Sequence, residues 1–170
     1  SSLGVNHYIN PNALNLSSAA GGVKLNSWNH IAVSRSGTST NNTKIFINGE
    51  LVAQGTNNST LVSTGSNLTL GGDANGDESV LTGYISDARI VKGTAVYTAA
   101  FTPPTAPLTA VTNTTFLLNP NPSIIDKAQK DGLFEFYGNV TGSDQQQLFS
   151  SSTMKFDGNG DYILLREGLP

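Results

Sequence analysis

The segment Ser27–Gly55 constrains the fold most, because it predicts three strands and also the type of one of the turns between them. Apolar and polar side chains alternate within Trp28–Arg35, which is the period of a strand and not of a helix. Lys44–Asn48 alternates in the same way, and Glu50–Ala53 follows it. Between the last two segments, Asn48-Gly49 predicts a two-residue type I′ turn, since Asn and Gly best tolerate the positive φ angles that it requires. We therefore expect three antiparallel strands here.

The alternation also predicts which side chains of these strands face the interior. Ile31 and Val33 share one face of the first strand, and Ile45 and Ile47 share one face of the second. We expect these four residues to form the core face of the sheet, because one face of an antiparallel sheet is normally buried. The intervening Gly37–Thr43 is rich in Gly, Ser, Thr and Asn, so we expect a surface loop.

The rest of the chain predicts many short strands separated by turn-forming residues. We expect at most one helical turn, at Lys127–Gly132. Short strands with frequent turns are typical of an all-β protein, either an antiparallel β-sandwich or a jelly roll. The clearest further strand candidates are Leu68–Leu70, Gly83–Lys92, Phe116–Asn119 and Leu133–Tyr137. Met154–Ile163 predicts a strand, a Gly-rich turn and a second strand.

Composition excludes several functional classes. Only 12% of the 170 residues are charged and the net charge is −3, without the basic cluster that phosphate binding needs, so we expect no nucleic-acid partner. The chain has no cysteine, which excludes disulfides and thiolate zinc sites. No apolar run reaches membrane-spanning length and the first residues are no signal peptide, so we expect no membrane insertion.

Both ends of the sequence read as if cut from something longer.

The prolines Pro103, Pro104 and Pro107 predict an extended segment without regular structure, because each removes a backbone donor and restricts its neighbour. We expect Tyr97 and Phe101 to anchor this segment against a sheet. It would then finish one domain or begin a linker.

Candidate catalytic residues do not form a recognisable pattern. Glycosidases need two carboxylates close together, and the four glutamates, Glu50, Glu78, Glu135 and Glu167, are widely separated in the sequence. His7 and His30 lack Ser or Asp neighbours at a spacing that indicates a triad. We therefore expect no catalytic residues and no enzyme.

The cofactor that the residues themselves favour is calcium. Asp73, Asn75 and Asp77 place oxygen-bearing side chains two residues apart in a Gly-containing loop, as a hard cation requires. The alternative is that these side chains stabilise the turn through hydrogen bonds to the backbone.

Two segments together resemble a known family. Trp28–Arg35 followed by Ile45–Gly49 resembles the core signature of laminin-G-like, concanavalin A-like jelly rolls, and Gly83–Ile90 resembles their closing strand. The variant is similar to modules repeated in tail-fibre and virion proteins of bacteriophages, notably marine phages, and in bacterial adhesins. Ser86 stands where the family often has a second Asp.

The segment Met154–Tyr162 resembles the opening strand of such a module, although it follows the other segments instead of preceding them. The resemblance implies a circularly offset module or a fragment of a tandem array. Residues 1–110 would be the back part of one module, 111–153 a connecting segment and 154–170 the opening strands of the next. In related modules the turn that holds Asp157 and Asp161 often lies near a cation, so calcium is a second expectation there, with turn geometry again as the alternative.

The resemblance implies a non-enzymatic adhesion module in a virion tail, a surface fibre or another extracellular fibre. Its partners would be a host-surface glycan or protein, reached through the loops Gly37–Thr43 and Asp73–Glu78. Tyr84 or Tyr97 would stack on sugars, or would pack in the core or the extended segment. The alternative is a structural spacer that binds its own copies or neighbouring fibre proteins. A central Trp-containing strand of the family is missing from the chain, which favours assembly with another copy, so we expect a homo-oligomer.

Overall fold

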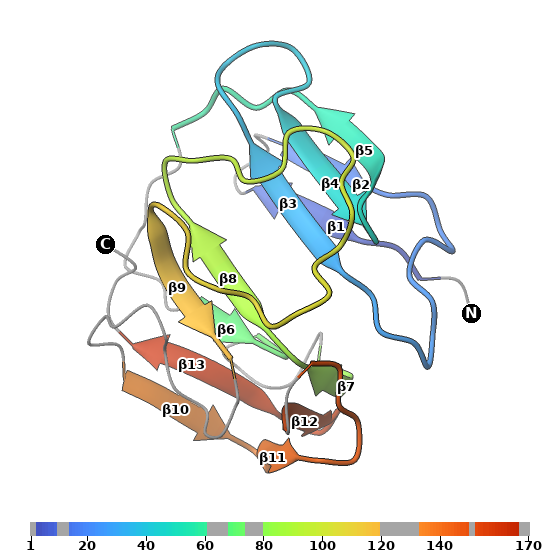
Figure 1. Ribbon diagram of the computed structural model, residues 1–170, viewed down its shortest axis with the longest axis vertical. Coiled ribbons are helices and arrows are strands. Elements are labelled where there is room, and N and C mark those ends of the chain that lie inside the picture. The colour runs from blue at the N-terminus through green and yellow to red at the C-terminus, as the bar shows by residue number, and fades with distance from the viewer. Residues whose placement is uncertain are drawn as a thin grey trace. The chain divides into compact units, whose positions relative to one another are not determined.

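The computed structural model describes residues 3–9, 14–60, 68–73, 80–119, 133–149 and 152–166. Within these ranges it contains strands paired in antiparallel fashion and no helix, so the all-β prediction is confirmed for them (Figure 1). The part of the chain that the structure describes accordingly holds no apolar helix that could cross a membrane. The chain divides into two compact units: unit 1 comprises Ser1–Leu61 and Gly93–Pro104, and unit 2 comprises Val62–Lys92 and Thr105–Pro170.

Unit 1 contains a two-stranded ribbon and a three-stranded sheet. Both central residues of the predicted turn have positive φ, 52° at Asn48 and 83° at Gly49, so the hairpin prediction is confirmed. The sheet has the order β3-β4-β5 and the ribbon pairs β1 with β2. The strands of unit 1 are β1 (Asn6–Ile9), β2 (Leu14–Ser17), β3 (Ile31–Arg35), β4 (Thr43–Ile47) and β5 (Glu50–Gly55).

Strand β4 is covered on both faces. Its residues Ile45 and Phe46 are fully buried although they point to opposite sides of the sheet. On the Ile45 face lie Leu14 and Leu16 of β2, whose methyl carbons are 3.2 and 3.5 Å from the point where a Cβ on Gly55 would stand. On the Phe46 face lies Gly93–Pro104, which we call the strap. The sheet of unit 1 is therefore a middle layer.

The predicted core face of this sheet is half right. Ile45 and Ile47 are buried as expected, but Ile31 and Val33 are each 43% exposed. All four lie on the same face, because Ile31 pairs with Ile47 and Val33 with Ile45. The leucines of β2 cover that face beside β5, on the far side of β4 from β3. The two side chains of β3 are therefore left largely uncovered.

Unit 2 contains three small sheets, with the orders β10-β13-β6, β11-β12-β7 and β8-β9. The pairs join residues far apart in the sequence: β7 pairs with β12, and β6 with β13. The strands of unit 2 are β6 (Leu68–Leu70), β7 (Thr82–Ile85), β8 (Ala88–Val91), β9 (Thr114–Leu118), β10 (Leu133–Tyr137), β11 (Thr141–Ser143), β12 (Thr153–Asp157) and β13 (Tyr162–Arg166).

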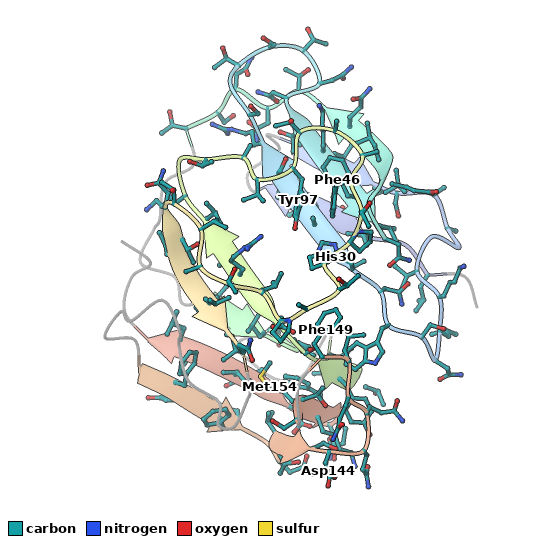
Figure 2. The ribbon with its side chains drawn as sticks, viewed as in Figure 1. His30, Phe46, Tyr97, Asp144, Phe149 and Met154 are labelled. Atoms are coloured by element: carbon teal, nitrogen blue, oxygen red, sulfur yellow. The ribbon has the colours of Figure 1, made fainter. Side chains whose placement is uncertain are left out.

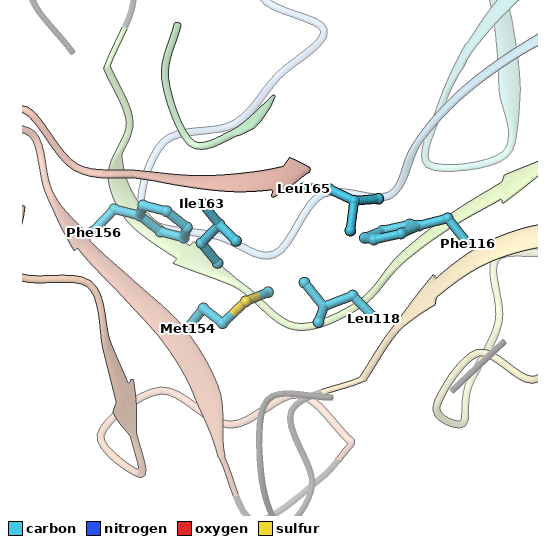
Figure 3. Packing of buried hydrophobic residues seen from close by; sticks show 6 residues of the cluster. All are labelled: Phe116, Leu118, Met154, Phe156, Ile163 and Leu165. Atoms are coloured by element: carbon cyan, nitrogen blue, oxygen red, sulfur yellow. The ribbon is translucent and has the colours of Figure 1, made fainter. Parts of the chain in front are cut away.

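One apolar cluster joins the three sheets of unit 2 (Figure 3). Strand β9 supplies Phe116 and Leu118, β12 supplies Met154 and Phe156, and β13 contributes two more. Within each strand these residues are two apart, so one face of every sheet turns toward the cluster. The six central residues are Phe116, Leu118, Met154, Phe156, Ile163 and Leu165.

The prediction of one continuous strand over Gly83–Lys92 is wrong. The chain forms β7 and β8, which belong to different sheets, with Ser86 and Asp87 between them. The Asp87 carboxylate accepts hydrogen bonds from Ser86 Oγ (2.6 Å) and from the backbone N–H of Leu108 (3.1 Å). These side-chain bonds hold the chain at the break, where one segment passes from the sheet of β7 to the sheet of β8.

The predicted division into residues 1–110, 111–153 and 154–170 stays a prediction. Within unit 2 the segment expected to open a next module, β12, pairs with β7, which lies in the segment expected to close the first. The expected helical turn at Lys127–Gly132 lies outside the described residues.

Replacing Phe156 by Ala tests the core of unit 2. The ring is fully buried, so we expect the free energy of unfolding of this unit to fall by about 3–5 kcal/mol through lost burial and the resulting cavity. Phe136→Ala is the matched control, because Phe136 is 46% exposed; we expect a loss of about 1 kcal/mol. Chemical denaturation of both variants measures the difference, and equal losses would contradict the assignment of Phe156 to the core.

Candidate functional site

Four aromatic rings hold the strap on the sheet of unit 1. The rings of Tyr97 and Phe101 are stacked, with centroids 3.6 Å apart and planes 9° from parallel. The imidazole of His30 meets both rings edge-on, at 5.9 and 5.4 Å, and Phe46 lies 5.5 Å from Phe101. Figure 2 shows His30, Phe46 and Tyr97 gathered over β3 and β4. This packing gives Tyr97 a structural role in the strap, as one of the two expectations had it.

Polar groups fix the strap along its length. Ser34 Oγ donates a hydrogen bond to the carbonyl of Tyr97, and Lys44 Nζ donates one to the carbonyl of Thr98 (2.6 Å). The N–H of Phe101 donates to the carbonyl of Gly49 (3.0 Å). A Cβ on Gly49 would collide with the carbonyl oxygen of Phe101, so this position needs glycine for the close approach as well as for its positive φ. The hairpin turn thus also receives the strap.

A buried asparagine organises the predicted contact loop Gly37–Thr43. The side-chain N–H groups of Asn42 point to the carbonyls of Gly37 and Asn57 and to Oδ1 of Asn58, each at 2.9 Å. Its Oδ1 accepts from the N–H of Asn57 at 2.8 Å. Asn42 is buried, so these bonds replace water and tie the loop to the segment after β5.

The exposed part of the same loop therefore stands on a fixed base. Residues 38–41 are exposed, and the N–H of Asn41 donates to Thr56 Oγ1 at 2.9 Å. A loop whose ends and middle are hydrogen-bonded loses little conformational freedom when it binds a partner. The loop is thus suited to present its hydroxyl-bearing side chains in one arrangement.

The acidic loop with the first calcium prediction is largely outside the described residues. Asp73 is described and partly buried, whereas Asn75 and Asp77 lie outside the described ranges. Calcium at this loop stays a prediction.

At the second predicted calcium position, the two carboxylates serve the turn between β12 and β13. Asp161 is fully buried, with one oxygen accepting from the N–H of Asn139 (2.7 Å) and the other from the N–H of Asp157 (2.6 Å). Asp157 is exposed and accepts from the side chain of Asn139 and the N–H of Asn159, both at 2.8 Å. The hydrogen bond from the Asn139 side chain, followed by that from the Asn159 backbone, holds the pKa of Asp157 below its usual value.

These bonds match the turn-forming alternative, because the Asp161 carboxylate accepts the backbone N–H groups of both Asn139 and Asp157. Among the residues that the structure describes, no three or more His, Asp or Glu side chains gather in a way that could hold a metal. Calcium beside Asp157 and Asp161 also stays a prediction.

Tyr84 lies on the outward face of the β11-β12-β7 sheet. It pairs with Lys155, whose neighbours Met154 and Phe156 point into the core, so Tyr84 and Lys155 point away from it. The Tyr84 hydroxyl donates a hydrogen bond to Gln145 Oε1 at 3.4 Å. Tyr84 is thus not part of the core, and its role toward a ligand stays a prediction.

Those candidate acid–base residues that the structure describes lie on different elements of the fold. Glu50 begins β5 of unit 1, and Glu135 lies in β10 of unit 2, where it accepts a hydrogen bond from the Tyr137 hydroxyl at 2.8 Å. Glu78 and Glu167 lie outside the described residues. His30 is packed among the strap aromatics.

Two features of these sites had no signal in the sequence. Asn42 resembles any other asparagine of a polar loop, and its burial depends on the segment 15 residues later. The rings of Tyr137 and Tyr162 stack at 4.4 Å although the two residues are distant in the chain. Both contacts follow from strand pairing, which local sequence does not show.

Comparison with known proteins yields one match. The model of a protein family described as the concanavalin A-like lectin/glucanases superfamily, of the laminin G type, matches residues 5–100. The matched range includes all strands of unit 1 together with β6, β7 and β8 of unit 2. No curated protein and no solved structure matches the chain.

Replacing Asn42 by Ala tests the base of the contact loop. The change leaves buried backbone groups without their partners, so we expect the free energy of unfolding of unit 1 to fall by about 1–3 kcal/mol. Ser39→Ala, in the exposed part of the same loop, is the control and should change stability by less than about 0.5 kcal/mol. Denaturant titration measures both, and an unaltered midpoint for Asn42→Ala would contradict the structural role of its amide.

A chelator experiment tests the calcium prediction at the acidic loop. If calcium binds the folded chain there, calcium at about 100 times its dissociation constant raises stability by about 2.7 kcal/mol, and the melting temperature rises with it. Asp73→Ala combined with Asp77→Ala should abolish this rise. A melting temperature that neither calcium nor chelator changes in the unsubstituted chain would show that the loop binds no calcium.

Proposed function

Because the chain belongs to the concanavalin A-like lectin/glucanases superfamily, whose modules bind carbohydrate or protein, we propose that it is an adhesion module of a phage fibre or another extracellular fibre. Its partner would be a glycan or a protein on a host surface. The family match over residues 5–100 carries this proposal, and the preorganised loop Gly37–Thr43 supplies a surface with which to make the contact.

Several features support a role outside the cell in a fibre. The polar surface consists mainly of neutral Asn, Ser, Thr and Gly, since only 12% of residues are charged. The motifs around Trp28 and Gly83 resemble modules repeated in phage fibres. Absence of cysteine is compatible with a bacterial or phage surface protein, which needs no disulfides.

Two observations favour binding without catalysis. Modules with the laminin G type of this fold are typically non-catalytic. Of the four glutamates, the described ones, Glu50 and Glu135, belong to different units, and Glu135 is engaged by the Tyr137 hydroxyl. We propose that the chain is not an enzyme.

A structural role is the second candidate, and the edge of β3 favours it. Strand β3 has β4 as its only sheet neighbour among the described strands, and its residues Ile31 and Val33 are exposed. An edge strand with apolar side chains can pair with a strand of another molecule. A spacer that binds its own copies would use such an edge, and the expected homo-oligomer would form through it.

Binding assays on the intact chain distinguish the two candidates. For an adhesion module, we expect the chain to bind saccharides on a glycan array or proteins on host-type cells, and the triple variant Thr38→Ala, Ser39→Ala, Thr40→Ala to lose at least about tenfold in affinity, since loop hydroxyls would make the contacts. Light scattering after size exclusion measures the oligomeric state of both proteins. Self-association without binding to any surface would contradict adhesion and support the spacer.

A further inference from the structure

The outward face of the β1-β2 ribbon is a surface that the loop candidates Gly37–Thr43 and Asp73–Glu78 do not include. We propose that this face binds a neutral saccharide, with the ring of Tyr8 as the stacking surface and Asn6, Asn15 and Ser17 as hydrogen-bonding groups. The inference rests on the proposed function, because it adds to the loop Gly37–Thr43 a second contact surface of stated ligand class.

Strand pairing places these four residues on one face. Tyr8 stands directly opposite Asn15, and Asn6 opposite Ser17. Residues paired in this way have Cβ atoms about 4.5–5.5 Å apart and point to the same side, as do residues two apart along a strand. The four side chains therefore form one continuous surface around a single ring.

The opposite face of the ribbon is turned inward. Leu14 and Leu16 lie against β5 at Gly55, and His7, which pairs with Leu16, is partly buried. Burial lowers the pKa of His7 below its usual value, so this imidazole is neutral at pH 7. The ribbon is thus fixed on the sheet by one face and exposes the other.

The outward face is accessible to a ligand. Tyr8 is 56% exposed, and Asn6, Asn15 and Ser17 are exposed as well. The ribbon is held in register beyond its strands, because Val5 and Ser18 exchange backbone and side-chain hydrogen bonds of 2.9 Å. The ring and its polar neighbours therefore need no rearrangement to meet a flat ligand.

All five tyrosines lie within the described residues, and none of the other four is exposed. Tyr97 is stacked on Phe101, and Tyr137 is stacked on Tyr162. Tyr84 is partly buried and its hydroxyl is bonded to Gln145. Tyr8 is therefore the tyrosine whose ring is most open to a partner.

The face carries no charge, and this selects the ligand. The sequence has no Asp, Glu, Lys or Arg before Lys24, so the ribbon offers no charged side chain to an ionic group. Desolvating a carboxylate or phosphate without a counter-charge is costly, so sialylated, uronic or phosphorylated ligands gain nothing here. A ligand that is both neutral and rich in hydroxyl groups fits this chemistry.

A neutral pyranose matches the groups that are present. One side of the sugar ring carries C–H groups that can lie on an aromatic ring, and the rim carries adjacent hydroxyls. Each carboxamide supplies a donor and an acceptor side by side, so Asn6 and Asn15 can each bond to neighbouring hydroxyls, and the Ser17 hydroxyl can do either. In many small-molecule sites an aromatic surface binds the ligand and a few polar groups fix its orientation and the specificity of binding.

The test is a glycan array that carries neutral hexose and N-acetylhexosamine saccharides beside sialylated and uronic ones. The intact chain is displayed on multivalent beads, since a single open face binds weakly and valency raises the apparent affinity. We expect binding to neutral saccharides, a loss of at least about tenfold for Tyr8→Ala, and a change of less than about threefold for Tyr8→Phe, which keeps the ring. Asn15→Ala should lower binding further than Tyr8→Phe does.

Two controls separate binding from folding. Thr141→Ala, at an exposed position of β11 in unit 2, should leave the array signal unchanged. All variants should keep the melting temperature of the unsubstituted chain, because the substituted side chains are partly or largely exposed. NMR titration of the unsubstituted chain with the methyl glycoside of the best-bound sugar should shift the backbone amides of residues 6, 8, 15 and 17.

The outcomes distinguish this inference from the proposed function. Binding to neutral saccharides that Tyr8→Ala leaves intact, NMR shifts confined to other residues, or binding to acidic saccharides alone would overturn the inference and leave adhesion standing. Binding to host-type cells without binding to any saccharide would do the same. A chain that binds neither saccharides nor cells would overturn both.

Discussion

The burial of β4 on both of its faces holds unit 1 together. Ile45 and Phe46 point in opposite directions and neither is exposed, so the sheet needs a cover on each side. The ribbon covers one side through Leu14 and Leu16, and the strap covers the other through Phe101, whose backbone also bonds to Gly49. The ribbon packs one face against the sheet, and its opposite face, which carries Tyr8, points outward. The proposed saccharide face is therefore the face of the ribbon that is not used to cover β4.

Unit 2 depends on a different constraint, because it builds one core from two segments separated by the strap. Strand β12 packs Met154 and Phe156 into that core and pairs with β7 from the first segment. The break at Ser86-Asp87 lets the first segment supply two sheets, and the Asp87 carboxylate ties the break to the later segment by accepting the N–H of Leu108.

In both units a buried polar side chain fixes the loop or turn that holds a candidate site. Asn42 and Asp161 are buried polar side chains whose oxygens accept backbone N–H groups of other segments. Such residues fix loops by accepting backbone N–H groups that burial would otherwise leave without a partner. Beside each of them lie exposed residues, which are 38–41 in the contact loop and Asp157 in the turn.

Local pattern by itself determined the all-β class, the Asn48-Gly49 hairpin and the burial of Ile45 and Ile47, because alternation and turn preference act between near neighbours. The motifs around Trp28 and Gly83 also sufficed to indicate the family. Tertiary structure alone decided that Ile31 and Val33 stay exposed, that Gly83–Lys92 divides into two strands, and that Asn42 is buried. In each of these cases the outcome depends on which distant segment covers or pairs with the residue, and the same local alternation is compatible with either result. Tyr8 shows this most clearly, since its exposure and its uncharged neighbours Asn15 and Ser17 follow only once β1 has paired with β2 and the ribbon has turned its leucines inward.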